Sequence, residues 1–433
     1  MAIFARIIGI IKKKAIKETA IVTIGSLING ASLFLLNIIL ARIISKNDFG
    51  TFSLSLLALN TAGEISDFGL NSGLLRFAPY YISSNQREKL HQLVKTIWSW
   101  RVSLSTLLTA GGIIFAYPIS KYIFGQQSVA PYLMFVSFGI GGVIMLGFTV
   151  TYLQASQKFL TSATTQSLKG LMRLILFGIA AFSGIRSLFV FLGIYIFVPW
   201  LLYFFNSRFL PKDFRKIIID SEVKKKLHSQ LARFSFWLTV TSLIAILAGK
   251  LDQIMIGHFL GLEEVAVFTV AWQLIQVFPV IYGSAISVLM PKMSGIQSKN
   301  DLIIFVKRIS KYALITALII GIFLYPSRFL ILLLFGDKYR EAMPLFLLLS
   351  YGMLFNIVSI PFSIGVTLYN KTHLTTVSAI IQLILVLVCN YIFIPKYGIM
   401  GVGYTTIISL FTQFLWNVFF SLYLIRNHEL VVV

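Results

Sequence analysis

The sequence predicts an all-helical integral membrane protein, with twelve transmembrane helices arranged as two related six-helix lobes. Hydrophobic residues make up 57% of the chain and charged residues only 12%, whereas soluble domains carry about 25% charged residues. The apolar residues form long runs, and a helix needs about 20 residues to cross the hydrocarbon of a bilayer. The runs lack the ten-residue alternation of a membrane β-barrel. Features of the first half also recur in the second half.

The recurrence is clearest between Ala41–Ser55 and Gly257–Ala271. Each stretch ends one apolar segment, continues through a short turn with an acidic residue, and begins a second segment. A phenylalanine stands at the matching place in each, Phe52 or Phe268. Pairs of aromatic, proline and glycine residues recur in the same order further along. Two related membrane halves are typical of transporters that rock one half against the other around a central site.

The apolar runs predict six helices in each half, and the longest and most charged loop separates the halves. We predict a cytoplasmic amphipathic segment over 1–18, an N-lobe over 19–206, a basic cytoplasmic linker over 207–232, a C-lobe over 233–426 and a cytoplasmic tail over 427–433. The predicted helices cover residues 19–43, 50–80, 94–117, 130–153, 162–183, 187–206, 233–258, 264–290, 308–326, 342–369, 373–394 and 401–425.

Lys and Arg residues predict the orientation, because cytoplasmic loops of membrane proteins carry an excess of them. With the N-terminus inside, the cytoplasmic regions hold 23 of the 37 Lys and Arg residues and the outer loops hold 7. We therefore expect a multi-pass protein of the cell membrane with both termini in the cytoplasm. Residues 1–18 interleave lysines with isoleucines, which favours a helix lying on the membrane surface.

The sequence lacks motifs for catalysis, cofactors and metals. It contains no GxxxxGK[ST], HExxH, CxxC or GxSxG motif, its five histidines are scattered, and Cys389 is the only cysteine. We therefore expect no enzymatic activity, no cofactor, no metal site and no intrachain disulfide. A net charge of +22 would suggest nucleic-acid binding in a soluble protein. Here the basic residues cluster in predicted cytoplasmic loops, so no nucleic-acid partner is expected.

Ionisable residues inside predicted spans are costly, and they indicate functional sites by default. Cations outnumber acids there, so a shared cavity would attract anions. The candidate substrate-binding residues are Arg76, Lys169, Arg173 and Lys250. Lys169 and Arg173 are four residues apart, share one helical face and cannot satisfy each other's charge. Alternatively, Lys169 extends to the membrane surface, and Lys250 pairs with a neighbouring helix.

The acidic residues within the spans are Glu64, Asp67 and Asp252. On one continuous helix, Glu64 and Asp67 would share a face, with Arg76 on roughly the same side. The three acids are candidates for binding a coupling proton or sodium ion, or for internal pairing, with Arg76 or Arg101 as partners of the first two. Arg101 follows two tryptophans, which also suggests an anchor at the membrane interface.

Two stretches carry a family resemblance. In Leu40–Tyr81 the relevant residues are Leu40–Arg42, Asp48-Phe49-Gly50, Asp67-Phe68-Gly69-Leu70 and Leu75-Arg76-Phe77. This stretch resembles the opening region of polysaccharide transporters in the multidrug/oligosaccharidyl-lipid/polysaccharide (MOP) superfamily, which also includes the MATE transporters. Leu251–Leu274 resembles a second motif of these proteins, with Asp252 at the matching place and Phe268 where a tyrosine is usual. The resemblance extends over nearly the whole chain.

The resemblance implies a MATE-like fold and a Wzx-type flippase. Such a protein moves polyprenyl-diphosphate-linked oligosaccharides from the inner to the outer leaflet by alternating access, for surface polysaccharide biosynthesis. The implied partners are the lipid-linked glycan and membrane lipid, with polysaccharide polymerase machinery as a further candidate. A cationic cavity would suit the diphosphate. Hydrogen-bonding groups for a sugar or for another helix are available on Asn60, Asn71, Gln154, Gln166, Gln273, Gln276, Asn356 and Gln382.

Two other functions compete with this interpretation. The first is a cation-coupled multidrug antiporter of the same superfamily, in which Glu64 and Asp67 would bind the coupling ion. The cation excess within the spans disfavours it. The second is a glycan polymerase or ligase. That function needs a catalytic outer loop, and the longest predicted outer loop, 327–341, offers little chemistry.

Overall fold

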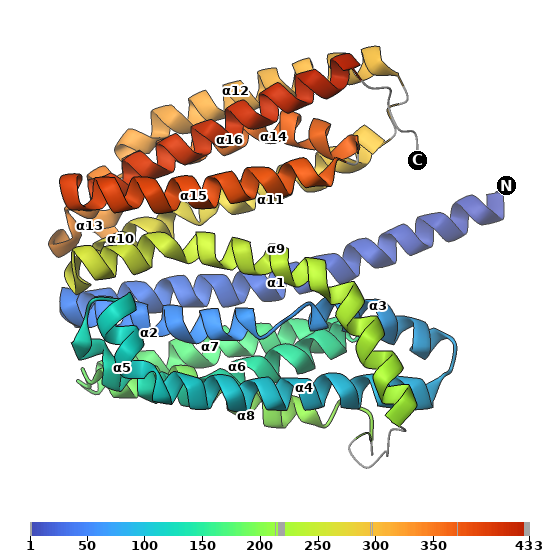
Figure 1. Cartoon of the computed structure of the whole chain (residues 1–433), viewed down its shortest axis with the longest axis horizontal. Helices are drawn as coiled ribbons and strands as arrows, with labels where there is room; N and C mark the ends of the chain where they lie inside the picture. The colour runs from blue at the N-terminus through green and yellow to red at the C-terminus, as the bar shows by residue number, and fades with distance from the viewer. Residues whose placement is uncertain are drawn as a thin grey trace. The chain divides into compact units, whose positions relative to one another are not determined.

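The computed structural model describes residues 2–212, 214, 221–294, 296, 298–369 and 371–427. Side chains are described throughout these ranges except at 2–16, 221–238, 241, 291, 294, 367, 372 and 373. All regular secondary structure in the described ranges is helical (Figure 1). The chain forms two compact units. The first comprises Met1–Tyr122 and Gln127–Leu243, and the second comprises Ile123–Gln126 and Ile244–Val433.

The first unit is built around α6, which packs against α2, α3, α4, α7 and α8. Glycines on α6 allow this close approach, since Gly141 and Gly142 lie directly against the indole of Trp200 on α8. Helix α9 begins in this unit and continues into the second. The helices are α1 (Ala2–Ile43), α2 (Lys46–Ile65), α3 (Leu70–Ser83), α4 (Arg87–Ile114), α5 (Ala116–Pro118), α6 (Ala130–Ala155), α7 (Phe159–Phe182), α8 (Leu188–Ser207) and α9 (Ser221–Phe259).

The second unit is built around α14, which packs against α10, α11, α12 and α16, while α15 packs against α16. Its apolar core includes fully buried side chains from α14 and from the short segment before it, such as Leu345, Leu349 and Tyr339. The helices after α9 are α10 (Leu262–Ile275), α11 (Val277–Ser294), α12 (Lys299–Ser327), α13 (Leu330–Phe335), α14 (Ala342–Leu368), α15 (Thr372–Tyr397) and α16 (Met400–Asn427).

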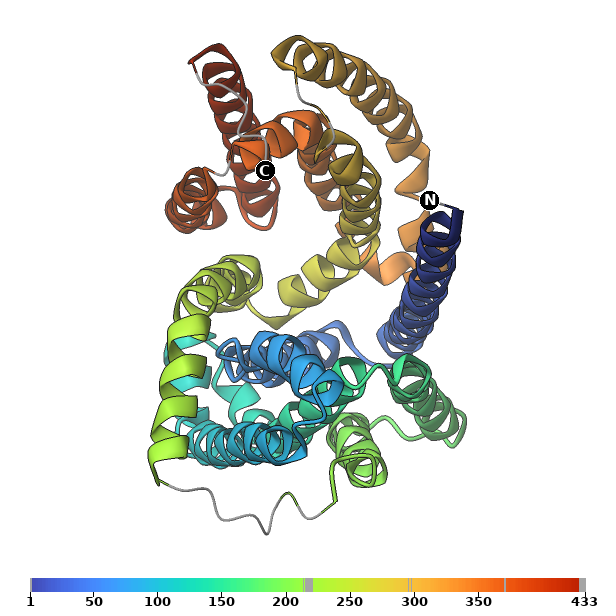
Figure 2. The ribbon, with the colours of Figure 1, turned by 90° about the vertical axis from the view of Figure 1, so that its right-hand side faces the viewer.

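Helices α1 and α7 run side by side in close contact (Figure 2). Gly25 on α1 lies so near Ala163 that a Cβ atom at Gly25 would fall 2.7 Å from the Ala163 carbonyl oxygen. Gly170 on α7 lies equally near Asn29, with 2.7 Å between a built Cβ and the Asn29 Cα. Small residues let membrane helices approach in this way. The seam between these helices therefore depends on the two glycines.

The helix predicted over 50–80 is broken in the structure into α2 and α3. Phe68 and Gly69 both adopt left-handed backbone conformations, with φ of 42° and 67°. This conformation is uncommon for a residue other than glycine. Glu64 therefore lies on α2, whereas Asp67 lies in the break. The shared helical face predicted for Glu64, Asp67 and Arg76 is wrong, because the break interrupts the helical phase between them.

Within the described residues, nine helices are long and apolar enough to cross a membrane. The number rises to ten if α4 and the following Ala116–Ile123, bent by 61°, form one span. Of the twelve predicted segments, α2–α3 and α7 are not among these ten. The break leaves α3 only 14 residues long, too short to cross a membrane alone. Helix α7 carries the polar residues Lys169 and Arg173, which lower its hydropathy.

Some predicted boundaries fall on parts of the chain that the structure does not describe. The amphipathic character of 1–18 depends on side chains that are undescribed at 2–16. Residues 213 and 215–220 of the predicted linker, and 428–433 of the predicted tail, also lie outside the described residues. These boundaries stay predictions.

Candidate functional site

A polar cavity of about 360 Å³ lies within the first unit. Five helices contribute to its wall, namely α2, α3, α6, α7 and α8. The lining contains two cations, several amides and hydroxyls, and a smaller apolar part. The lining residues are Asn60, Asn71, Val143, Leu146, Gly147, Val150, Thr151, Gln154, Thr165, Gln166, Lys169, Arg173 and Pro199.

Lys169 and Arg173 line this cavity one turn apart on α7. Arg173 is 6% exposed, and its Nη2 atom donates a hydrogen bond of 3.3 Å to the Tyr195 carbonyl oxygen. Its Nε atom is buried without a hydrogen-bond partner among the described residues. Within the described part of the chain, neither cation has a carboxylate partner, and no Asp or Glu lines the cavity. The cavity wall therefore carries uncompensated positive charge.

Aromatic packing positions the guanidinium of Arg173. Its Cζ atom lies 4.0 Å from the centroid of the Tyr195 ring, a cation–π contact. The Tyr195 ring in turn packs edge-on against Phe52 and Phe177, at centroid distances of 5.6 and 5.9 Å. A ring contact of this kind fixes the cation without neutralising its charge. Arg173 is thus held at the cavity wall and can still bind an anion.

One face of α6 forms the opposite part of the lining. Gly147, Thr151 and Gln154 follow one another at spacings of four and three residues, which places them on one face of a helix. A Cβ atom at Gly147 would meet nothing within 4 Å, so the glycine leaves the cavity open at this point. Gln154 also lines a second, adjoining hollow of about 550 Å³. That hollow is lined by Glu18, Thr19, Val22, Thr23, Leu75, Pro79, Gln154, Ala155, Gln157 and Phe159.

Arg101 and Asp67 form an ion pair beside the cavity, at the break between α2 and α3, in which Arg101 is buried and the Asp67 side chain is 34% exposed. Arg101 is 3% exposed, and its Nη2 atom lies 2.5 Å from Asp67 Oδ1. The same Nη2 donates to Asn71 Oδ1 at 2.9 Å, and Nη1 donates to the Ser66 carbonyl oxygen at 3.1 Å. Asp67 also accepts the backbone N–H of Asn71, in the first turn of α3, which is one of the N–H groups without a partner inside the helix. The guanidinium of Arg101 is therefore bonded inside the first unit.

The other predicted site residues are not among those that line this cavity. Arg76 on α3 is exposed, with its guanidinium 5.7 Å from the Phe77 ring centroid, and Glu64 is exposed on α2. Lys250 and Asp252 lie on the part of α9 that belongs to the second unit. Asp252 accepts a 2.6 Å hydrogen bond from Nδ2 of Asn390 on α15. Of the four candidate cations, the structure thus brings together Lys169 and Arg173.

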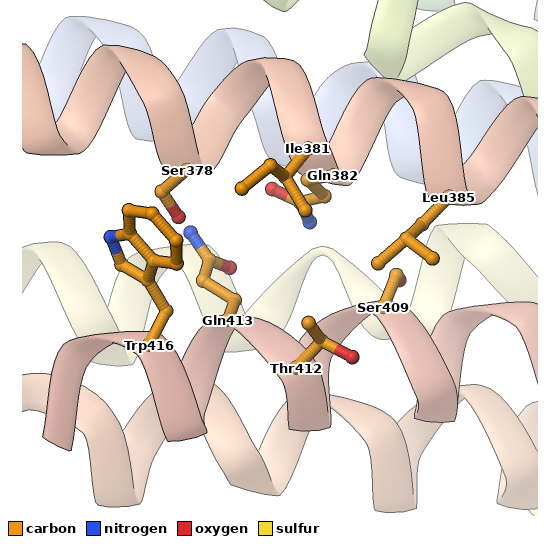
Figure 3. A pocket seen from close by; sticks show the side chains of 8 residues that line it. All are labelled: Ser378, Ile381, Gln382, Leu385, Ser409, Thr412, Gln413 and Trp416. Atoms are coloured by element: carbon orange, nitrogen blue, oxygen red, sulfur yellow. The ribbon is translucent and has the colours of Figure 1, made fainter. Parts of the chain in front are cut away.

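The second unit contains a much smaller polar cavity between α15 and α16 (Figure 3). Its volume is about 10 Å³, which is room for roughly one water molecule. The buried indole N–H of Trp416 has no hydrogen-bond partner among the described residues. The site holds no charge and is too small for a glycan in this conformation. It is lined by Ser378, Ile381, Gln382, Leu385, Ser409, Thr412, Gln413 and Trp416.

The hydroxyls of Thr151 and Thr165 line the cavity but were not among the predicted site residues. A signal was available for Thr151, because Gly147, Thr151 and Gln154 have helical spacing on an otherwise apolar segment. Asn60, Asn71, Gln154 and Gln166 were anticipated only as hydrogen-bonding groups without a location. The helix break makes Asn71 a neighbour of Arg101, and no spacing rule predicts that contact.

Comparison with protein-family models gives two matches. A model described as polysaccharide biosynthesis protein matches residues 15–297, which is more than half of the chain. A model described as MatE matches residues 238–392. Among individual proteins, an uncharacterized membrane protein of Methanocaldococcus jannaschii is 24% identical, over 94% of this chain and 84% of the relative. A putative O-antigen transporter of Shigella flexneri is 23% identical, over 84% of this chain and 87% of the relative.

Two solved structures illustrate the likeness in fold. The lipid II flippase MurJ in an inward closed conformation gives a TM-score of 0.72 at 14% identity, covering 92% of this chain and 86% of that chain. A multidrug resistance MATE family transporter of the MOP superfamily in an inward-facing conformation gives 0.71 at 13% identity, covering 92% and 96%. At these identities the likeness shows the fold alone. Together with the apolar helices, it shows a multi-pass membrane protein with the fold of these transporters.

Proposed function

Because this chain belongs to the polysaccharide biosynthesis protein family of the MOP superfamily, we propose that it is a flippase for polyprenyl-diphosphate-linked oligosaccharides. It moves them from the inner to the outer leaflet of the cell membrane, for surface polysaccharide biosynthesis. The putative O-antigen transporter among its relatives supports this choice by name. The cavity of the first unit supports it chemically.

The observation that carries the proposal is the charge of that cavity. Lys169 and Arg173 line it without a carboxylate partner among the described residues. Arg173 is buried and Lys169 is half-buried, and holding two such cations on one wall is costly unless an anion joins them. A diphosphate supplies the missing negative charge, and amides and hydroxyls around it suit the hydroxyl groups of a sugar.

The proposed architecture has twelve transmembrane helices in two six-helix lobes, working by alternating access. The nine apolar spans of the described residues support it, with α4 and Ala116–Ile123 as a tenth if they form one span, and α2–α3 and α7 would complete the number as polar spans that face the cavity. Both termini are proposed to lie in the cytoplasm. Polysaccharide polymerase machinery is the proposed protein partner, since the flipped unit would pass to it.

The test combines Lys169→Ala with Arg173→Ala and scores surface glycan in a flippase-deficient strain. Each hydrogen bond to a charged group contributes about 1.5–3 kcal/mol, so losing both should reduce export by more than about 100-fold. The control combines Lys158→Ala with Arg208→Ala, which removes the same charge from exposed positions of the same unit. Normal export by the first variant, at equal protein level in the membrane, contradicts the proposal.

A multidrug antiporter is the second candidate, and the match to the MatE model favours it. It would use Glu64 and Asp67 to bind a cation. Asp67 is already paired with Arg101, which leaves less negative charge for an ion. The assay is efflux of a cationic dye. Efflux that depends on Glu64 and Asp67, with no glycan export, would establish the antiporter instead of the flippase.

A further inference from the structure

The side chain of Asn71 is held in one orientation by two neighbours. Its Oδ1 atom accepts from Arg101 Nη2 at 2.9 Å and lies 3.1 Å from the hydroxyl of Thr151. A guanidinium carries only hydrogen-bond donors, so the amide atom facing Arg101 must be the oxygen. The amide nitrogen, with its two N–H groups, therefore points away from Arg101.

The amide nitrogen of Asn71 has no acceptor among the described residues, although Asn71 lines the cationic cavity. An amide fixed through its oxygen presents a pair of donors to whatever occupies that cavity. Asn71 also lies in the first turn of α3, where its backbone N–H donates to Asp67 Oδ1 at 3.1 Å. Backbone and side chain are thus both held in place before any ligand binds.

We propose that Asn71 is a substrate-contacting residue that donates a hydrogen bond to a diphosphate oxygen, and that Arg101 is the positioning residue that orients its amide. This inference rests on the proposed function. It assigns to the Arg101–Asp67 pair a role other than ion coupling. The opposite charges of Arg101 and Asp67 balance each other. The neutral amide of Asn71, oriented by Arg101, then offers a hydrogen-bond donor to the cavity that Lys169 and Arg173 also line.

Two substitutions of Asn71 separate loss of the donor from added charge. Asn71→Ala removes the donor and leaves the pairing of Arg101 with Asp67 and Ser66 intact. Asn71→Asp keeps an oxygen for Arg101 and Thr151, preserves the shape of the side chain, and replaces the donor by a carboxylate. The matched control is Asn47→Asp, which adds the same charge at an exposed position on α2 outside the cavity.

The measurement is binding of a short, sugar-free polyprenyl diphosphate to the purified full chain. We expect Asn71→Ala to weaken binding about tenfold or more, as for loss of a hydrogen bond to a charged group. Asn71→Asp should weaken it further, and Asn47→Asp should leave it unchanged. Wild-type affinity in both Asn71 variants overturns the assignment of Asn71. Failure of the wild type to bind the diphosphate overturns the proposed function as well.

A double-mutant cycle tests the positioning role of Arg101. Arg101→Lys keeps a positive charge for Asp67, but one ammonium cannot reproduce the planar fork that reaches Ser66, Asp67 and Asn71 together. If Arg101 orients Asn71, the Asn71 amide contributes less to diphosphate binding in the Arg101→Lys variant than in the wild type. Combining Arg101→Lys with Asn71→Ala should then cost less than the product of the two single losses. Independent, multiplicative losses would show that Arg101 supports the fold without orienting Asn71.

Discussion

Replacing Gly170 by alanine should weaken the seam between α1 and α7, whereas the same change at Gly178 on α7 should not. A methyl group at Gly170 would lie 2.7 Å from the Asn29 Cα and 3.0 Å from the Ser32 Cβ, while one at Gly178 meets nothing within 4 Å. The Asn29 Cα is a backbone atom, so a change of side-chain rotamer cannot relieve this contact. The two helices must move apart to accept the methyl group.

The magnitude follows from two opposing effects. Alanine favours a helix over glycine by about 1 kcal/mol, and overpacking costs about 1–3 kcal/mol. Gly178→Ala should gain the first alone, so the variants should differ by about 1–3 kcal/mol in stability. At about 2–4 °C per kcal/mol for domains of 150–250 residues, the apparent Tm values in one detergent should differ by several degrees. Equal increases in Tm for the two variants would refute the close contact at Gly170.

Three further predictions address the cavity, the ion pair and the orientation. Gly147→Leu should block glycan export at normal protein level, because the larger side chain fills open cavity space. Gly178→Leu is the control. Full export by Gly147→Leu would exclude the cavity from the transport path. Asp67→Asn should lower stability by up to about 3 kcal/mol because it removes the negative charge that faces the buried Arg101, while the Tm of Glu64→Gln, changed at an exposed site, should stay within error. In a Cys389→Ser background, Lys338→Cys should react with a membrane-impermeant thiol reagent in intact cells, and Lys299→Cys should not. The opposite pattern would contradict the predicted orientation with both termini in the cytoplasm.

The helical membrane fold could be predicted because lipid solvation leaves long apolar runs in the sequence. Two of the expected spans, α2–α3 and α7, are not among the apolar spans of the described residues. The break at Phe68 and Gly69 leaves α3 too short, and α7 exchanges apolar residues for part of the polar lining of the cavity. The pair Lys169 and Arg173 could be placed together because both lie on one unbroken helix. Helical spacing is reliable over a single turn.

Arg76 shows why the rest of the site could not be predicted. Its expected position depended on a continuous helix from Glu64 onward, and the break at Phe68 and Gly69 removed that continuity. Gly63 and Gly73 flank the break yet remain helical, so glycine content alone does not locate it. The partner of Asp67 was equally hidden, because Arg101 reaches it across 34 positions of sequence.

The unbalanced charge of Lys169 and Arg173 should also make the stability of the protein depend on the anions in solution. An anion that binds only the folded state adds RT ln(1 + [L]/Kd) to the free energy of unfolding, about 2.7 kcal/mol at 100 times its Kd. A purification in phosphate or pyrophosphate buffer should therefore yield a more heat-resistant preparation than one in chloride of equal ionic strength. The choice of buffer therefore matters for biochemical work on this protein. Samples prepared in multivalent anions for crystallography or electron microscopy should contain an anion bound in the cavity.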